Sequence, residues 1–144
     1  GLATVAAPRS VLNAISAHAP ELMTEALEET DSGGISWLSL STLKTLFQGK
    51  TVVAIGPGLG LHPQTVDVTR RLVDESELPL VIDADALNAL AEAGFAARGR
   101  ARVLTPHPGE MARLTGAPVE AIQGDRLGAA RAFAAQSGAT VVLK

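Results

Sequence analysis

Residues 103–111 read Val103-Leu104-Thr105-Pro106-His107-Pro108-Gly109-Glu110-Met111 and join a short apolar run to a turn that carries an imidazole and a carboxylate. Two other segments have the same layout. Residues 51–55 (TVVAI) run into the glycine-rich corner 56–60 (GPGLG), and residues 80–82 (LVI) run into 83–88 (DADALN). Apolar strands that end in polar or glycine-rich corners are typical of a parallel sheet with helices on both faces. We therefore expect chemistry at these strand ends.

The rest of the chain alternates short apolar runs with longer Ala- and Leu-rich segments of helical period, which predicts repeated βαβ units. Residues 21–27 alternate weakly, so a strand and a helix both stay open there. The sequence thus predicts an α/β fold with a mostly parallel sheet. Its expected strands lie near 2–6, 51–55, 79–82, 102–105 and 140–143, and its expected helices over 9–15, 36–47, 63–73 and 118–136.

Composition and charge narrow the classes of partner. With 144 residues, 47% of them hydrophobic, the chain is long enough for one domain that buries roughly two-thirds of its unfolded surface. The formal net charge is −3 and the basic residues are scattered, so we expect neither nucleic acid nor a membrane surface as a partner. The absence of cysteine excludes disulfides and thiolate metal sites. No apolar run reaches the roughly 18 residues of a membrane helix, and we expect a cytoplasmic protein.

Both ends of the chain have the character of a strand. Residues 1–8 begin with an apolar run and no initiator Met, and residues 140–144 end on an apolar run. A strand at the end of a chain lacks the loop or helix that should cover it. We therefore expect a single domain over 1–144 that is an internal fragment of a longer one, incomplete at both ends.

The strand-end corners are the candidate sites, because ligands of open α/β sheets bind beyond the carboxyl ends of the strands, where helix N-termini present N–H groups. In the corner 56–60, glycine allows backbone amides to approach an anion or a flat ring closely. The corner lacks the Gly-Lys-Ser/Thr of a Walker loop and the spacing of the dinucleotide fingerprint. A tight turn without a ligand is the alternative interpretation.

Asp83 and Asp85 lie two residues apart after their strand, so we expect one of them to face the cleft. The alternative role is helix capping, and Asp85 suits the N-cap of a helix that begins near Ala86. Asn88 lies about one turn further on, within reach of a ligand or of the preceding loop.

His107 lies between two prolines, and a ring restricted in this way at a cleft mouth is suited to hydrogen bonding a polar ligand group. Glu110 is favoured near the first turn of a helix by the macrodipole, which is its structural alternative. His18 and His62 are expected at the surface. No His and carboxylate set has metal-ligand spacing and no Gly-x-Ser-x-Gly nucleophile elbow occurs, so we expect neither a metal site nor hydrolase chemistry of these kinds.

Five motifs, in order along nearly the whole chain, together carry a family resemblance: residues 1–6 (GLATVA), 54–60 (AIGPGLG), 81–88 (VIDADALN), 104–111 (LTPHPGEM) and 141–144 (VVLK). In these motifs the chain resembles the ADP/ATP-dependent NAD(P)H-hydrate dehydratases of the ribokinase-like superfamily. The resemblance implies a three-layer α/β/α fold and a homo-oligomeric lyase that repairs hydrated NADH or NADPH. It implies ADP or ATP as the phosphoryl donor, with Mg²⁺ as a candidate companion.

Position by position, the resemblance implies a shared cleft and a nucleotide segment. The implied cleft-lining residues are Gly58, Gly60, Asp85, Asn88 and His107, of which Gly60 and His107 contact the hydrated nicotinamide nucleotide. Lys144 would be the first residue of the adenine-nucleotide segment.

Two features of the family have no counterpart within residues 1–144. One is a Gly-Ser-rich substrate loop that precedes the position of Gly1. The other is a Gly-x-Gly-Asp segment beyond Lys144, which carries the anion hole and the aspartate expected to act as catalytic base. Since that segment would stabilise the transferring phosphoryl group, we expect the catalytic residue to lie beyond Lys144 and this chain alone to be inactive.

Two alternatives remain open at the level of sequence. A small-molecule kinase of the same superfamily, acting on a thiamin precursor, would share the sheet and the nucleotide position. A non-catalytic module that binds a nucleotide or a partner protein is the second alternative. The Thr-Pro-His-Pro-Gly-Glu run resembles the dehydratases better than the kinases.

Overall fold

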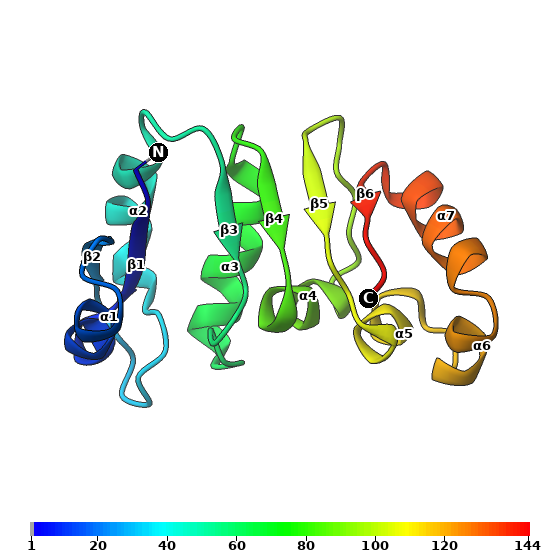
Figure 1. The fold of residues 1–144 in the computed structure, drawn as a ribbon, viewed down its shortest axis with the longest axis horizontal. Helices are drawn as coiled ribbons and strands as arrows, with labels where there is room; N and C mark the ends of the chain where they lie inside the picture. The colour runs from blue at the N-terminus through cyan, green and yellow to red at the C-terminus, as the bar shows by residue number, and fades with distance from the viewer. Residues whose placement is uncertain (1) are drawn as a thin grey trace.

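A computed structural model describes residues 2–144 and contains two parallel sheets (Figure 1). The larger sheet has four strands in the order β3-β4-β5-β6, and a separate pair is formed by β1 and β2. The strands are β1 (Thr4–Pro8), β2 (Met23–Leu27), β3 (Val53–Ile55), β4 (Leu80–Ile82), β5 (Arg102–Leu104) and β6 (Thr140–Val141). The helices are α1 (Leu12–His18), α2 (Leu40–Phe47), α3 (Pro63–Glu75), α4 (Ala84–Ala91), α5 (Pro108–Thr115), α6 (Val119–Gly124) and α7 (Arg126–Ser137), with 3-10 helices η1 (Arg9–Val11) and η2 (Trp37–Ser39).

All pairings between these strands are parallel, as predicted. The five expected strands are present, with ends that differ by a few residues. The open question over 21–27 is resolved in favour of a strand, because β2 pairs with β1 and buries Leu27. Local alternation was too weak to predict this, since the neighbouring strand supplies the stabilising contacts.

The single helix predicted over 118–136 is wrong, because the structure contains two helices there. Helix α6 ends at Gly124, and α7 begins at Arg126. Asp125 between them has φ −144° and ψ 75°, and its carboxylate accepts a hydrogen bond from the Gly128 N–H at 2.8 Å. The cause is local: an aspartate side chain that captures a free amide starts a new helix and interrupts the old one.

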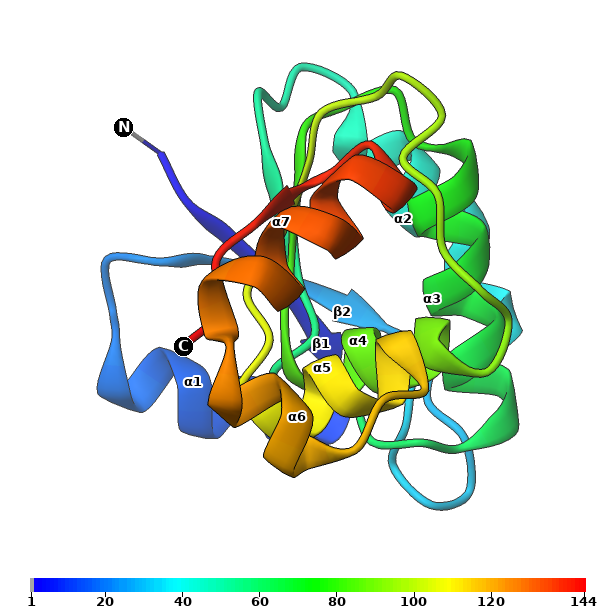
Figure 2. The same ribbon diagram turned by 90° about the vertical axis from the view of Figure 1, so that its right-hand side faces the viewer.

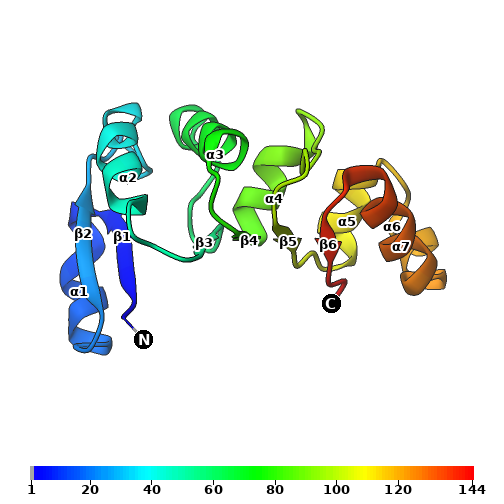
Figure 3. The same cartoon turned by 90° about the horizontal axis from the view of Figure 1, so that it is seen from above.

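Successive side chains along each strand point to opposite faces of the four-stranded sheet. Ile82, Leu104 and their neighbours pack against the helices that follow them, in one core that includes Leu87, Met111 and Phe133. Figure 3 shows α2, α3 and α4 on one side of the strands. Helix α1 lies on the other side, as Figure 2 also shows. Within residues 2–144, no helix combines the length and the apolarity needed to cross a bilayer.

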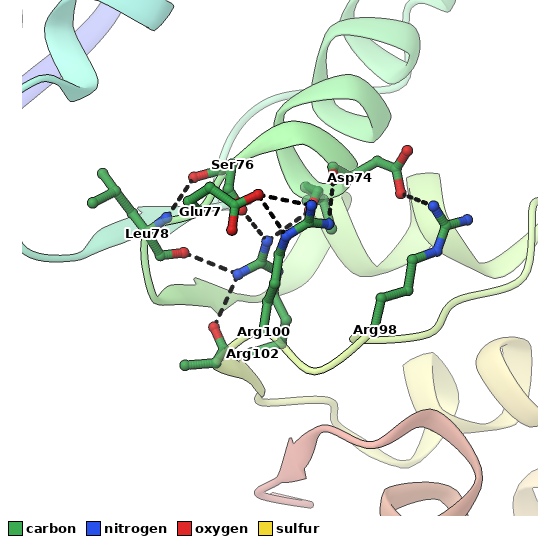
Figure 4. Close-up of polar contacts among 9 residues, drawn as sticks. Asp74, Ser76, Glu77, Leu78, Arg98, Arg100 and Arg102 are labelled. Carbon is green, nitrogen blue, oxygen red and sulfur yellow. Dashed lines mark hydrogen bonds and ion pairs between the residues drawn. The ribbon is translucent and has the colours of Figure 1, made fainter.

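At the amino end of β5, Arg102 fixes the sheet to the end of α3 (Figure 4). Its guanidinium donates hydrogen bonds to the backbone carbonyls of Val73, Ser76, Leu78 and Ala101. Carbonyls in the last turn of a helix have no partner within the helix, so a buried arginine is a favourable donor there. Burial lowers the pKa of Arg102 from its ordinary value, but arginine stays protonated in proteins, so the guanidinium keeps all its donors.

Candidate active site

The four strands of the larger sheet end in register, which places the segments that follow them along one edge. Ile55 pairs with Ile82, Ile82 with Leu104, and Leu104 with Val141. Backbone hydrogen bonds continue past the strands, from Asp83 N–H to Ile55 at 3.1 Å and from Lys144 N–H to the Pro106 carbonyl at 2.9 Å. We call the segments 56–60, 83–85, 105–107 and 142–144 the carboxyl edge. The structure therefore brings all the sequence-predicted corners together.

The glycine-rich corner requires glycine at its first position. Gly56 has φ +140°, and a Cβ built there would overlap the backbone carbonyl of Asp83. The close approach of the two backbones holds the ends of β3 and β4 together. This need at Gly56 is visible only in three dimensions, because the sequence shows a run of glycines without showing which of them contacts the next strand.

Asp85 ties the far end of that corner to α4. Its carboxylate accepts a hydrogen bond from the Gly60 N–H at 2.8 Å, in a loop where Gly58 and Gly60 both have positive φ. The interpretation of Asp85 as the N-cap of α4 is wrong, because the helix begins at Ala84 and its N-cap is Asp83. Asp85 is instead a residue of the first turn, which leaves its carboxylate free to reach back to the loop.

Asn88 lies in a hollow of ≈ 560 Å³ that opens beside the glycine-rich corner. Its side-chain oxygen accepts a hydrogen bond from the Arg113 guanidinium at 2.9 Å, so α4 and α5 are joined by this pair. The Asn88 side chain therefore contacts helix α5 and not the loop that precedes α4. Arg113 was not foreseen in the sequence, because it lies 25 residues from its partner. The lining of the hollow is Leu61, Val66, Asn88, Ala89, Ala91, Glu92 and Arg113.

His107 caps α5 and still presents part of its ring at the edge. Its Nδ1 accepts hydrogen bonds from the N–H groups of Gly109 at 3.0 Å and Glu110 at 3.3 Å. The Glu110 carboxylate in turn accepts from the His107 N–H at 2.8 Å, which completes a capping box. Since Nδ1 must accept, the neutral ring carries its proton on Nε2. The His107 side chain is 52% exposed, and its Nε2 lies 3.4 Å from Oε1 of Glu110, which is buried and structural.

The other two histidines lie away from the carboxyl edge. His18 is exposed at the end of α1, as predicted. His62 is half-buried and caps α3 by accepting a hydrogen bond from the Gln64 N–H at 3.2 Å, so its expected surface role is only partly correct. A sequence signal existed, because His62 precedes a proline at the start of a helical segment, as His107 does.

Asp83 and Lys144 form an ion pair across the edge that was not foreseen in the sequence. Lys144 Nζ lies 2.8 Å from Oδ1 and 3.1 Å from Oδ2 of Asp83. Burial raises the pKa of Asp83, but the hydrogen bonds from Lys144 and the Ala84 N–H outweigh it and lower the pKa below its ordinary value. The carboxylate is thus ionised at neutral pH and neutralises the ammonium beside it.

A family model described as NAD(P)H-hydrate dehydratase matches residues 1–144. The chain belongs to the NAD(P)H-hydrate dehydratase family. Among its relatives, the bifunctional NAD(P)H-hydrate repair enzyme Nnr of Moorella thermoacetica is 44% identical over 146 residues, and that of Thermofilum pendens is 40% identical. Each match covers 100% of this chain and 28% of the relative, so the chain spans just over a quarter of the length of these relatives.

Solved structures confirm the ribokinase-like three-layer α/β fold. A ribokinase-like superfamily protein from Enterococcus faecalis superposes with a TM-score of 0.80 at 25% identity, over 99% of this chain and 47% of that one. The ADP/ATP-dependent NAD(P)H-hydrate dehydratase from Bacillus subtilis, co-crystallised with ATP/Mg²⁺ and soaked with CoA, gives 0.73 at 26% identity. That match covers 100% of this chain and 48% of that one. The motifs at the carboxyl edge therefore lie on a chain of the NAD(P)H-hydrate dehydratase family with this fold.

Proposed function

We propose that the full-length protein containing this chain dehydrates hydrated NADH or NADPH, with ADP or ATP as the phosphoryl donor. The observation that carries the proposal is the dehydratase family match over residues 1–144, four of whose five motifs reach the carboxyl edge. The relatives named NAD(P)H-hydrate repair enzymes and the Bacillus subtilis structure obtained with ATP/Mg²⁺ support the substrate and the donor.

In this proposal, the two ends of the edge hold different ligands. The substrate end consists of Gly58, Gly60, Asp85, Asn88 and His107, which line the cleft for the hydrated nicotinamide ring. The Nε2–H of His107 donates to a polar group of that ring, because its Nδ1 is already occupied by the helix. The nucleotide end is Lys144, whose ammonium faces the phosphates.

The chemistry converts a poor leaving group into a good one. The ring hydroxyl oxygen attacks the terminal phosphorus of the donor nucleotide, and the bond from that phosphorus to the bridging oxygen breaks. The hydroxyl proton passes to the aspartate expected beyond Lys144. The electron pair of the ring nitrogen then expels inorganic phosphate by breaking the C–O bond of the new ester, and loss of the proton from the adjacent ring carbon restores the dihydronicotinamide. Residues 2–144 bind and orient the reactants in this scheme, and the catalytic aspartate is expected beyond Lys144.

Any Mg²⁺ that accompanies the nucleotide would be held mainly by phosphate oxygens. Across the part of the chain that the structure describes, no group of three or more His, Asp or Glu side chains can hold a metal ion. The two aspartates of the carboxyl edge are engaged, Asp83 by Lys144 and Asp85 by the Gly60 N–H. Mg²⁺ commonly binds through substrate phosphates with few protein ligands, so this arrangement fits such an ion.

Turnover by the purified full-length protein tests the proposal. Hydrated NADH and NADPH are incubated with ADP or ATP, and recovery of the reduced cofactor is followed by its near-ultraviolet absorbance. Nucleotide-dependent recovery is expected. Phosphorylation of a thiamin precursor without recovery of the cofactor would instead favour the superfamily kinase, and nucleotide binding without any turnover would favour a binding module.

Assembly and location belong to the same proposal. We infer a homo-oligomer, as the resemblance to the dehydratases implies, and a location in the cytoplasm. Sedimentation velocity of the full-length protein tests the assembly, and a single monomeric species would contradict it.

A further inference from the structure

Asp83 does not cap its helix in the usual way. An N-cap side chain ordinarily accepts from the second or third amide of the helix. The Asp83 carboxylate accepts from the amide of Ala84, the very next residue, at 2.8 Å. Both carboxylate oxygens also contact the Lys144 ammonium. Capping therefore does not account for where this side chain points.

The ion pair joins two strands that are not neighbours. Asp83 follows β4 and Lys144 follows β6, so the pair spans the end of β5. The backbone of Lys144 is fixed there by its hydrogen bond to Pro106. The ammonium is consequently restrained from both sides, at its own backbone and at its tip.

The backbone around Asp83 is held in a costly conformation. Ala84 has φ +50°, a left-handed conformation that is unfavourable for residues with a Cβ. Gly56 lies so close to the Asp83 carbonyl that no other residue fits. Strain of this kind persists where the surrounding structure enforces it, and it clusters at functional sites. The position of Asp83 is thus determined by three segments of the fold.

The pair leaves part of the ammonium available. Lys144 has three N–H donors, and the two oxygens of Asp83 engage two of them. The Lys144 side chain is 47% exposed and that of Asp83 is 30% exposed, so the pair is open to the edge. A lysine is a point charge on a flexible stem, and a fixed partner gives that charge a direction.

We propose that Asp83 is a positioning residue, which holds the ammonium of Lys144 so that its remaining N–H donor meets the phosphates of the bound nucleotide. This inference rests on the proposed function, because Lys144 is taken as the nucleotide contact. Without Asp83 the lysine side chain must be ordered when nucleotide binds, which raises the dissociation constant for nucleotide roughly three- to tenfold. A role in capping alone predicts no such change.

The test compares two aspartates that both cap helices. Asp83→Asn and Asp83→Ser keep a side chain suited to the N-cap and remove the charge that holds Lys144. Asp125→Asn is the matched control, since Asp125 caps α7 through Gly128 and has no lysine partner. Binding of ADP and ATP to the full-length protein is measured by titration calorimetry, and the thermal midpoint of each variant is recorded. The expected three- to tenfold weakening occurs in the Asp83 variants and not in Asp125→Asn.

Repeating the Asp83 substitution in a protein that lacks the Lys144 ammonium shows whether Asp83 acts through Lys144. In Lys144→Gln, adding Asp83→Asn should produce no further loss of nucleotide binding, because residues that act as a unit are not additive. An unchanged or tighter dissociation constant in Asp83→Asn and Asp83→Ser, or an equal loss in both lysine backgrounds, overturns the proposal. Wild-type protein that binds nucleotide without turning over hydrated cofactor would contradict the proposed function only, so the two failures are distinguishable.

Discussion

At the amino edge of the four-stranded sheet, Arg102 is 2% exposed and its side chain donates hydrogen bonds to four backbone carbonyls. At the carboxyl edge, by contrast, the side chains of Asp83 and Lys144 form an ion pair and stay partly exposed to solvent. Both edges therefore carry restrained charges. The guanidinium at the amino edge has a structural role, because it donates hydrogen bonds to carbonyls at the end of α3. The charges at the carboxyl edge keep bonding capacity, and this is the property that a ligand site needs.

The two edges also differ in the surroundings of their residues with unfavourable backbone conformation. Two residues other than glycine have positive φ among those described, Arg98 near the amino edge and Ala84 at the carboxyl edge. Arg98 lies in an exposed turn and pairs with Asp74 at 2.8 Å on the surface (Figure 4). Ala84 lies between Asp83 and Asp85, directly behind the ion pair. A strained residue in an open turn carries no implication for function, but one beneath a restrained ion pair does.

The largest effect is expected at the amino edge. Arg102→Met removes the donor of four backbone carbonyls, of which those of Val73 and Ser76 make buried bonds. It should lower the free energy of unfolding by about 3–5 kcal/mol, since each unsatisfied buried group costs roughly 1–3 kcal/mol. Arg98→Met is the control and should leave it nearly unchanged, because its ion pair is exposed. Denaturant unfolding of the full-length protein provides the measurement. A small effect for Arg102→Met would show that the amino edge is not structural.

Gly56→Ala should produce the next largest loss, and it should affect both stability and turnover. The added Cβ meets the Asp83 carbonyl and takes an unfavourable φ, which costs about 2–3 kcal/mol and separates β3 from β4. Gly49→Ala is the control, because Gly49 has φ +75° and open space around it. It should cost only about 1 kcal/mol and spare turnover. Equal losses in the two variants would mean that the close approach at Gly56 has no importance.

Substitutions of His107 distinguish its proposed role as a ligand contact from its role as a helix cap. His107→Ala should weaken binding of the hydrated substrate by about 1–3 kcal/mol and leave ADP binding nearly unchanged. His107→Asn keeps a capping side chain but lacks the Nε2–H donor, so it should show the same loss for the substrate with a smaller loss of stability. Calorimetric titration with each ligand gives the comparison. Equal loss for both ligands would show that the histidine is purely structural.

The smallest expected effect is a gain in stability. Ala84→Gly relieves the positive φ at the carboxyl edge and should raise the free energy of unfolding by about 0.5–1 kcal/mol, without raising turnover. Arg98→Gly relieves the same strain at the amino edge and serves as its control. If the strain at Ala84 supports the position of Asp83, only Ala84→Gly should weaken nucleotide binding. Thermal unfolding and nucleotide titration distinguish the two variants.

The sequence was sufficient to predict the parallel sheet and the edge on which the motifs meet, because apolar strands followed by polar corners have few other folds. It was insufficient where partners are distant. Asp83 and Lys144 are 61 residues apart, and their pairing depends on β5 lying between them. It also failed where two local roles compete: His107 is both a cap and an exposed donor, and Asp125 breaks a helix that periodicity alone would continue.

The order of the strands has a consequence for how the protein is made. Strands β3 to β6 lie side by side in the order in which the ribosome delivers them, so each new strand docks on the one synthesised just before it. Such nearest-neighbour growth keeps each loop closure as short as a parallel crossover allows, which limits its entropic cost. The lysine that meets Asp83 follows the last of these strands. Until it is delivered, the nascent edge carries an aspartate without its counter-ion.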